Sequence, residues 1–215
     1  MSPLTTSEWG ALLIFASAMS FTPGPNTTLS AALAANGGMK AAWRFVVAVP
    51  VGWGLLLTLS ATGVGAVLQW HPSVRVVLQV LGFAYLVYLA WKLWRTAALP
   101  CAAAGGHDVF EAPDPARPVW QVGFVQGVML QFVNIKAWMN AWVVSSGWIA
   151  SAPQATERLL WVLPVMMLYG LLSNLSYALV GAVLRRWLSH GQRLLAFNRT
   201  MAAALVLTAL WMMTL

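Results

Sequence analysis

The residues best suited to chemistry in this 215-residue chain form a run of helix-breaking residues, Thr22-Pro23-Gly24-Pro25-Asn26. The two prolines cannot donate backbone hydrogen bonds, so a helix cannot run straight through this segment. The segment lies within a long apolar run, where lipid offers no substitute partners. Beyond the break, Asn26 and Thr27 begin a second half-helix, whose free amides and positive dipole end favour an anion such as a carboxylate.

A lysine in the second half of the chain supplies a matching positive charge. Lys136 follows Gln131 and Asn134 and lies 16 residues after Trp120 and 13 before Ile149. It is therefore roughly 20 Å from either end of an apolar helix, at about 1.5 Å per residue. A charge at mid-membrane costs about 2.5–3.5 kcal/mol, and such residues are functional by default. We predict that Lys136 binds substrate.

The composition places these residues in a membrane. Hydrophobic residues make up 60% of the chain and charged residues only 8%, whereas a soluble domain is about a quarter charged. The net charge of +7 comes from basic residues that lie mostly between apolar runs, so we reject a nucleic-acid partner. A single cysteine, Cys101, and three scattered histidines predict no disulfide, no metal site and no cofactor.

Six apolar segments predict an all-α membrane protein with six transmembrane helices. A polar, proline-rich stretch between the third and fourth segments indicates a linker. We therefore expect a first three-helix repeat over 1–95, a cytoplasmic linker over 96–118 and a second three-helix repeat over 119–215. Because each half has three spans, the second half enters from the opposite face, and the repeats are inverted. The six segments are Trp9–Ala35, Phe45–Leu68, Val74–Trp94, Trp120–Ile149, Leu159–Leu184 and Leu194–Leu215.

The two unusual segments occupy equivalent places in the two halves. Pro25 lies 16 residues after Trp9, as Lys136 does after Trp120. We therefore expect the first and fourth helices to be interrupted, a pattern typical of a midplane substrate site in a secondary transporter. The substrate-binding residues that this predicts are Thr22, Pro23, Gly24, Pro25, Asn26, Thr27, Gln131, Asn134 and Lys136. Other polar residues within the spans are expected to form interhelical hydrogen bonds instead: Gln126, Asn140, Ser173 and Asn174.

The basic residues predict the orientation. Nine of the twelve Lys and Arg residues flank the first-second, third-fourth and fifth-sixth connections, and only Arg75 and Arg158 lie on the opposite side. The positive-inside rule places these three connections in the cytoplasm and both termini outside. The N-terminus lacks the basic start of a signal peptide, so we expect the first span to be retained.

Motifs in these spans resemble those of the lysine exporter and homoserine/threonine resistance (LysE/RhtB) family of bacterial amino-acid exporters. The resemblance covers nearly the whole chain except the linker. It implies export of small amino acids across the bacterial inner membrane, driven by the proton gradient, by a protein that acts as a homo-oligomer. The motifs are Phe21-Thr-Pro-Gly-Pro-Asn26, Gly82-Phe-Ala-Tyr85-Leu-Val-Tyr88-Leu-Ala-Trp91-Lys92, Phe124-x-x-Gly127 with Asn134-x-Lys136, and Asn198-Arg199.

The chain departs from the pattern of that family in two spans. The usual fourth-span pattern is Asn-x-x-Asn-Pro-Lys, but Gln131 replaces the first Asn and Ile135 replaces the Pro, which predicts a milder second break. Many relatives have an aspartate after the second-span glycine, where this chain has Trp53. All five acidic residues lie outside the spans, so any proton coupling within the membrane would have to use Lys136.

These features predict a secondary transporter that exports small neutral amino acids or derivatives by alternating access, with membrane lipid around it. No acid in the spans can pair with a second substrate cation, which disfavours lysine and arginine as substrates. The alternative is an exporter or channel for another small solute or ion, because sequence does not distinguish a carrier from a pore. An enzyme is disfavoured, because no span contains His, Cys, Asp or Glu.

Overall fold

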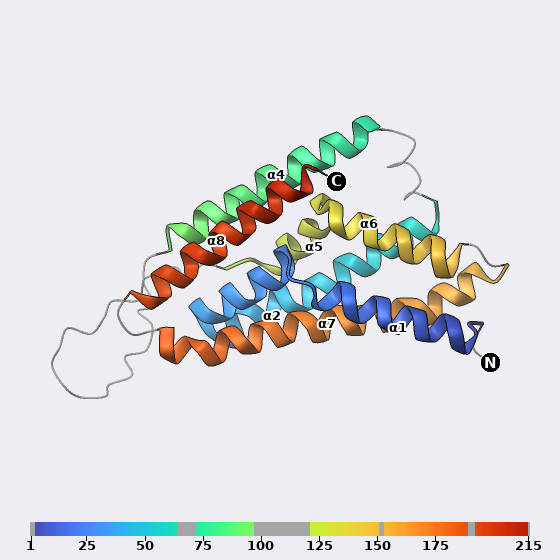
Figure 1. The fold of residues 1–215 in the computed structure, drawn as a ribbon, viewed down its shortest axis with the longest axis horizontal. Helices are drawn as coiled ribbons and strands as arrows, with labels where there is room; N and C mark the ends of the chain where they lie inside the picture. Colours follow the sequence, from blue (N-terminus) through green and yellow to red (C-terminus); the bar gives the residue numbers. More distant parts are fainter. Residues whose placement is uncertain (1–2, 64–71, 97–120, 151–152, 189–191, 215) are drawn as a thin grey trace.

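The computed structural model describes residues 3–63, 72–96, 121–150, 153–188 and 192–214, and these residues form an all-helical bundle (Figure 1). Four helices, α2, α4, α7 and α8, are long and apolar enough to cross a membrane, and α5 is a shorter apolar helix. A short π-helical segment, η1, follows α6. The elements are α1 (Thr6–Phe21), α2 (Pro25–Ala61), α4 (Pro72–Trp94), α5 (Phe124–Val133), α6 (Ile135–Val144), η1 (Ser145–Ile149), α7 (Ala155–Leu188) and α8 (Arg193–Met212).

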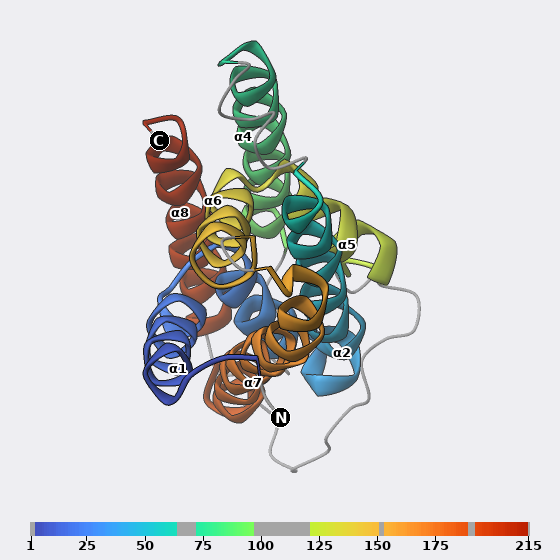
Figure 2. The same cartoon turned by 90° about the vertical axis from the view of Figure 1, so that its right-hand side faces the viewer.

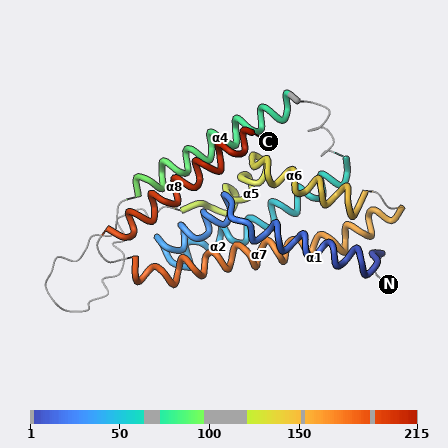
Figure 3. The backbone as a smooth tube through the Cα atoms, in the orientation of Figure 1, coloured from blue at the N-terminus to red at the C-terminus, as the bar shows by residue number. Residues whose placement is uncertain are grey.

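Helix α2 consists of two helices joined at Gly38. This residue has φ 74° and ψ −180°, which is outside the helical region, and glycine adopts such a positive φ without steric cost. The tube of α2 turns back on itself at this kink (Figure 3). The sequence predicted a connection between Ala35 and Phe45, but helical structure resumes directly after Gly38. The kink lies within the predicted connection, but the connection is one residue long rather than a loop, because one glycine suffices to reverse the chain.

The chain breaks its helices at both places that the sequence singled out. Between α1 and α2, Thr22 (φ −65°, ψ 126°) and Gly24 (φ −170°, ψ −173°) have extended backbone. Between α5 and α6 the break is the single residue Asn134 (φ −90°, ψ 98°). The second break is the shorter one, as expected where Ile135 replaces a proline.

The largest core cluster lies where α2 meets α5, α7 and α8, around the fully buried Leu33, Phe45 and Leu205. Helices α4 and α8 lie side by side along the bundle (Figure 2). Small residues bring backbones together, as is common between helices in membranes. A Cβ on Gly181 of α7 would collide with the carbonyl oxygen of Ala31 in α2. Glycine therefore fixes how closely these two helices pack.

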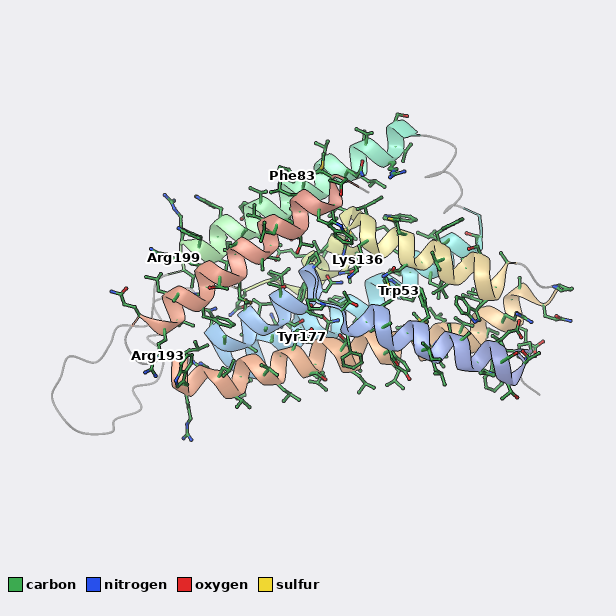
Figure 4. The ribbon with its side chains drawn as sticks, in the orientation of Figure 1. Trp53, Phe83, Lys136, Tyr177, Arg193 and Arg199 are labelled. Atoms are coloured by element: carbon green, nitrogen blue, oxygen red, sulfur yellow. The ribbon has the colours of Figure 1, made fainter. Side chains whose placement is uncertain are left out.

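Basic residues gather at one end of the bundle. Lys92 lies in the last turn of α4, Arg185 in the last turn of α7, and Arg193 begins α8. These helix ends lie together at the left of Figure 1, where Figure 4 also shows Arg199. The predicted linker, 96–118, falls outside the described residues except for Thr96.

At the opposite end, Glu8 fixes the start of α1. Its carboxylate accepts hydrogen bonds from the Thr5 backbone N–H (2.7 Å) and from Arg158 Nη1 of α7 (2.7 Å). The indole N–H of Trp148 in η1 donates to the Glu8 carbonyl oxygen (3.0 Å). The Thr5 N–H, Arg158 and the Thr5 hydroxyl together lower the pKa of Glu8, which precedes the first apolar run, from its usual 4.5 to about 2.

We expect Gly181→Ala to lower the free energy of unfolding by about 1–3 kcal/mol, because its methyl group would push α7 away from the Ala31 carbonyl. Thermal unfolding of the purified protein in detergent measures the effect. The matched control is Gly10→Ala in α1, where nothing lies within 4 Å of the added Cβ. Equal melting temperatures for the Gly181→Ala variant and the wild type would contradict the packing described.

We expect the stability conferred by Glu8 to depend on acid pH. Because its folded pKa is about 2 and its unfolded pKa 4.5, the contribution is complete above pH 4.5 and is lost as the pH falls toward 2. Melting temperatures of wild type and Glu8→Gln, measured across this range, should therefore converge as the pH falls. A difference that is the same at pH 7 and pH 3 would show that charge on Glu8 contributes nothing.

Candidate functional site

The two helix breaks line one cavity of about 90 Å³ in the middle of the bundle. Polar residues from the breaks form part of its wall, and aromatic and thioether side chains form another part. Figure 4 shows Lys136 and Trp53 in this central region, between α6 and α1. The lining residues are Phe15, Met19, Ser20, Thr22, Gly24, Pro25, Asn26, Thr27, Val49, Pro50, Trp53, Asn134, Lys136, Ala137, Asn140, Met166, Gly170 and Asn174.

The structure brings most of the predicted binding residues to this cavity. Pro23 and Gln131 are the two that do not line it. Gln131 is fully buried behind the cavity wall and holds that wall in place. The predicted residues that do line it are Thr22, Gly24, Pro25, Asn26, Thr27, Asn134 and Lys136.

Lys136 lies beside the start of α2. A Cβ on Gly24 would be 3.4 Å from Lys136 Nζ, so the ammonium group sits against the backbone at the first break. Pro25 is the first residue of α2, and the following amides, of Asn26 and Thr27, have no carbonyl partner within the helix. Among the described residues that line the cavity none is acidic. The helix start and the lysine thus present positive charge together.

Two backbone carbonyls at the end of α1 accept hydrogen bonds from α7. Ser173 Oγ donates to the carbonyl oxygen of Ser20 (2.5 Å), and Tyr177 Oη donates to that of Phe21 (3.0 Å). Tyr177 is labelled below the first break in Figure 4. These two carbonyls therefore already have donors from the protein, whereas the amides of Asn26 and Thr27 have no carbonyl partner within α2. Such amides at a helix start suit an anion better than a cation.

A reciprocal amide pair ties the two breaks together. Asn26 Nδ2 donates to Gln131 Oε1 (2.8 Å), and Gln131 Nε2 donates to Asn26 Oδ1 (3.1 Å) and to the Gly127 carbonyl (3.1 Å). The sequence predicted both side chains as substrate-binding residues, but each side-chain oxygen already accepts a hydrogen bond from the other amide. Their contact instead holds α2 against α5.

Asn134 supplies a free acceptor at the second break. Its side chain is only 3% exposed, and its Oδ1 atom has no hydrogen-bond partner among the described residues. A buried unpaired amide oxygen costs free energy of about 1–3 kcal/mol. Since Asn134 lines the cavity, a donor group of a bound ligand would satisfy it.

Of the four polar residues predicted to form interhelical bonds, two do so, Gln126 does not, and Asn140 lines the cavity. Asn174 accepts a hydrogen bond from Ser30 Oγ of α2 (2.9 Å), and Ser173 reaches α1, so both form interhelical bonds. Gln126 instead accepts a bond from the Gly123 N–H (2.9 Å) at the start of its own helix. For this residue the prediction was wrong, because an exposed helix start offers a nearer donor than a neighbouring helix does.

Sequence reasoning missed the apolar part of the cavity. Phe15 and Met19 come from α1, Trp53 from α2 and Met166 from α7. In a chain that is 60% hydrophobic, such residues carry no signal that separates a cavity wall from a lipid-facing surface. Polar residues stand out against this background, and apolar ones do not.

The family model described as a LysE type translocator matches residues 17–215. The chain belongs to the LysE family. It is therefore a transport protein of several membrane helices, and the family expected from its motifs is confirmed.

Curated relatives match this LysE-family protein over nearly its full length. The cysteine/O-acetylserine efflux protein of Salmonella typhimurium is 29% identical over 210 residues, which are 97% of each chain. The proteins of the same name from Klebsiella pneumoniae and Shigella flexneri are 27% and 28% identical, over 96% and 97% of this chain and 97% of their own. No solved structure matches the chain.

We expect Gln131→Met to lower the free energy of unfolding by about 0.5–2 kcal/mol, because it leaves the Asn26 amide unpaired between helices. A double-mutant cycle with Asn26→Leu isolates the contact. If the pair joins the breaks, the double variant should lose less stability than the two single variants combined. Strictly additive losses, measured by unfolding in detergent, would contradict a direct interaction.

Proposed function

We propose that this LysE-family protein exports small neutral amino acids or their derivatives from the cytoplasm, by alternating access at the cavity between the two helix breaks. The position of Lys136 beside Gly24, at the start of α2, carries the proposal. The names of its relatives, cysteine/O-acetylserine efflux proteins, support a substrate of this class.

The substrate carboxylate would lie between the first amides of α2, at Asn26 and Thr27, and the Lys136 ammonium. Both groups favour an anion, and lipid would offer no competing partner. The substrate ammonium would donate to Asn134 Oδ1, which is buried and has no partner among the described residues. The carboxylate and the ammonium of an amino acid would thus pair with the helix start and with this oxygen.

The absence of acid in the cavity wall favours neutral side chains. None of the described lining residues could balance the second positive charge of lysine or arginine, and an unbalanced charge at this depth is costly. An acidic side chain would compete with the carboxylate for Lys136. Neutral amino acids avoid both costs.

The membrane arrangement is part of the proposal. Residues 9–37 would form the first span and 39–61 the second. The third is α4, and the fourth is α5 with α6 and η1. The fifth is α7 from residue 159 onward, and the sixth is α8. They would form two inverted repeats, over 1–95 and 119–215, joined by the cytoplasmic linker 96–118. The gathering of basic residues at the end formed by Lys92, Arg185 and Arg193 supports placing that end in the cytoplasm and both termini outside.

Coupling to protons would use Lys136. Substrate carboxylate stabilises the charged lysine, and an empty cavity removes that stabilisation, so substrate release would favour loss of a proton. No acidic residue among the described lining residues offers an alternative carrier. The homo-oligomer that the family resemblance implied stays a prediction.

We expect Lys136→Met to reduce export at least tenfold, because it removes the charge that faces the substrate carboxylate. The assay is growth protection of a strain sensitive to amino-acid analogues and dipeptides, followed by export from vesicles. The control is Lys92→Met, which removes a basic residue at the end of α4, away from the cavity. Full proton-driven export by the Lys136→Met variant would eliminate lysine from both binding and coupling.

Counterflow in proteoliposomes tests alternating access. A carrier exchanges labelled substrate against an unlabelled pool on the other side, so we expect trans-stimulation. Flux without trans-stimulation would indicate a channel. Absence of protection across neutral, basic and acidic amino acids would contradict an amino-acid substrate altogether.

A further inference from the structure

The polar residues of the cavity account for the two charged groups of an amino acid but not for its side chain. An amino acid held by its carboxylate at α2 and Lys136, and by its ammonium at Asn134, must direct its side chain toward the remaining wall. The large apolar side chains of that wall are Phe15, Met19, Trp53 and Met166, and uncharged polar residues such as Asn140 and Asn174 lie beside them. Their rings and thioethers carry no charge, so the wall suits a neutral side chain.

Trp53 is the bulkiest residue of this wall, and its backbone cannot move aside. A Cβ on the preceding residue, Gly52, would lie 2.9 Å from the Val128 carbonyl oxygen of α5. A Cβ on the following residue, Gly54, would lie 3.0 Å from Met167 Sδ of α7. The two glycines let this turn of α2 pack tightly between α5 and α7.

The Trp53 ring is also held by its neighbours. It packs against the buried cluster that contains Leu56, Ala137 and Trp138, and against a second cluster that contains Leu57 and Val144. Trp53 is therefore packed on its backbone side by α5 and α7 and on its side chain by two buried clusters.

The cavity volume sets the scale of what this wall admits. A cavity needs roughly 10–15 Å³ to hold one water molecule, which is a single non-hydrogen atom. A cavity of about 90 Å³ therefore has room for about six to nine groups of that size. Alanine, serine and cysteine fall within this size. Phenylalanine and tryptophan exceed it.

We propose that Trp53 is the specificity-determining residue of this cavity, and that its indole ring restricts transport to amino acids with small neutral side chains by closing the space that a larger side chain would need. This proposal rests on the proposed function, because it takes the cavity to be the amino-acid site. The limit on side-chain size is then set by Trp53 of α2, and not by the groups that bind the carboxylate.

The test is export from proteoliposomes of labelled alanine, serine, phenylalanine and tryptophan, each measured separately. We expect the wild type to favour alanine over phenylalanine at least tenfold, a discrimination of the size that a hydrophobic pocket achieves. Trp53→Ala should reduce this ratio to less than threefold by raising phenylalanine export. Trp53→Phe should give an intermediate ratio. The control is Trp211→Ala, an exposed tryptophan of α8 outside the cavity, which should keep the wild-type ratio.

The outcomes separate this proposal from the proposed function. Wild-type protein that exports no amino acid contradicts the proposed function itself. Wild-type export of alanine with an unchanged ratio in Trp53→Ala overturns the role of Trp53 and leaves the exporter intact. A folded Trp53→Ala variant that exports nothing shows that the ring is needed for binding rather than for exclusion, and also overturns it. If the Trp53→Ala variant does not fold, the Trp53→Phe variant decides. A ratio of alanine to phenylalanine export equal to that of the wild type would then contradict the role of Trp53.

Discussion

A helix broken inside a membrane exposes backbone groups that lipid cannot satisfy, and the structure around Thr22–Gly24 is organised by that constraint. The carbonyls at the end of α1 accept hydrogen bonds from Ser173 and Tyr177 of α7. The amides at the start of α2 face a cavity and a lysine instead. The protein therefore provides partners for two carbonyls before the break, while the amides after it face the cavity, where the proposed function places the substrate carboxylate.

The first part of α2 has a second role, as the segment on which other helices are assembled. Asn26, Ser30 and Asn36 lie along it and bond to a different helix in turn: to Gln131 of α5, Asn174 of α7 and Asn198 of α8. Because each bond joins polar groups that lipid would leave unpaired, the three contacts fix the position of the broken helix. These contacts also fix the position of the cavity wall, because the amides at the start of α2 that face the cavity belong to the same segment.

Particular residues show which structural features could be predicted from the sequence and which could not. The prolines at 23 and 25 identified the first break, because proline acts on its own backbone whatever surrounds it. Lys136 identified the second, because a charge within an apolar run is rare. Gln131 was assigned to the cavity, but it lies behind the wall, where it pairs with Asn26. The two residues are 105 positions apart in the sequence. Their contact arises from helix packing, so no local sequence pattern predicts it.

The sequence by itself determined the helical class, the two helix breaks, the distribution of basic residues and the family, because each depends on the type and spacing of residues along the chain. Only the tertiary structure decided that both breaks line one cavity, that Gly38 reverses α2 without a loop, and that Trp53 faces the same space as Lys136. These features depend on how closely helices approach. Glycines such as Gly52 and Gly181 set that distance through the neighbours they meet, and those neighbours come from distant parts of the chain.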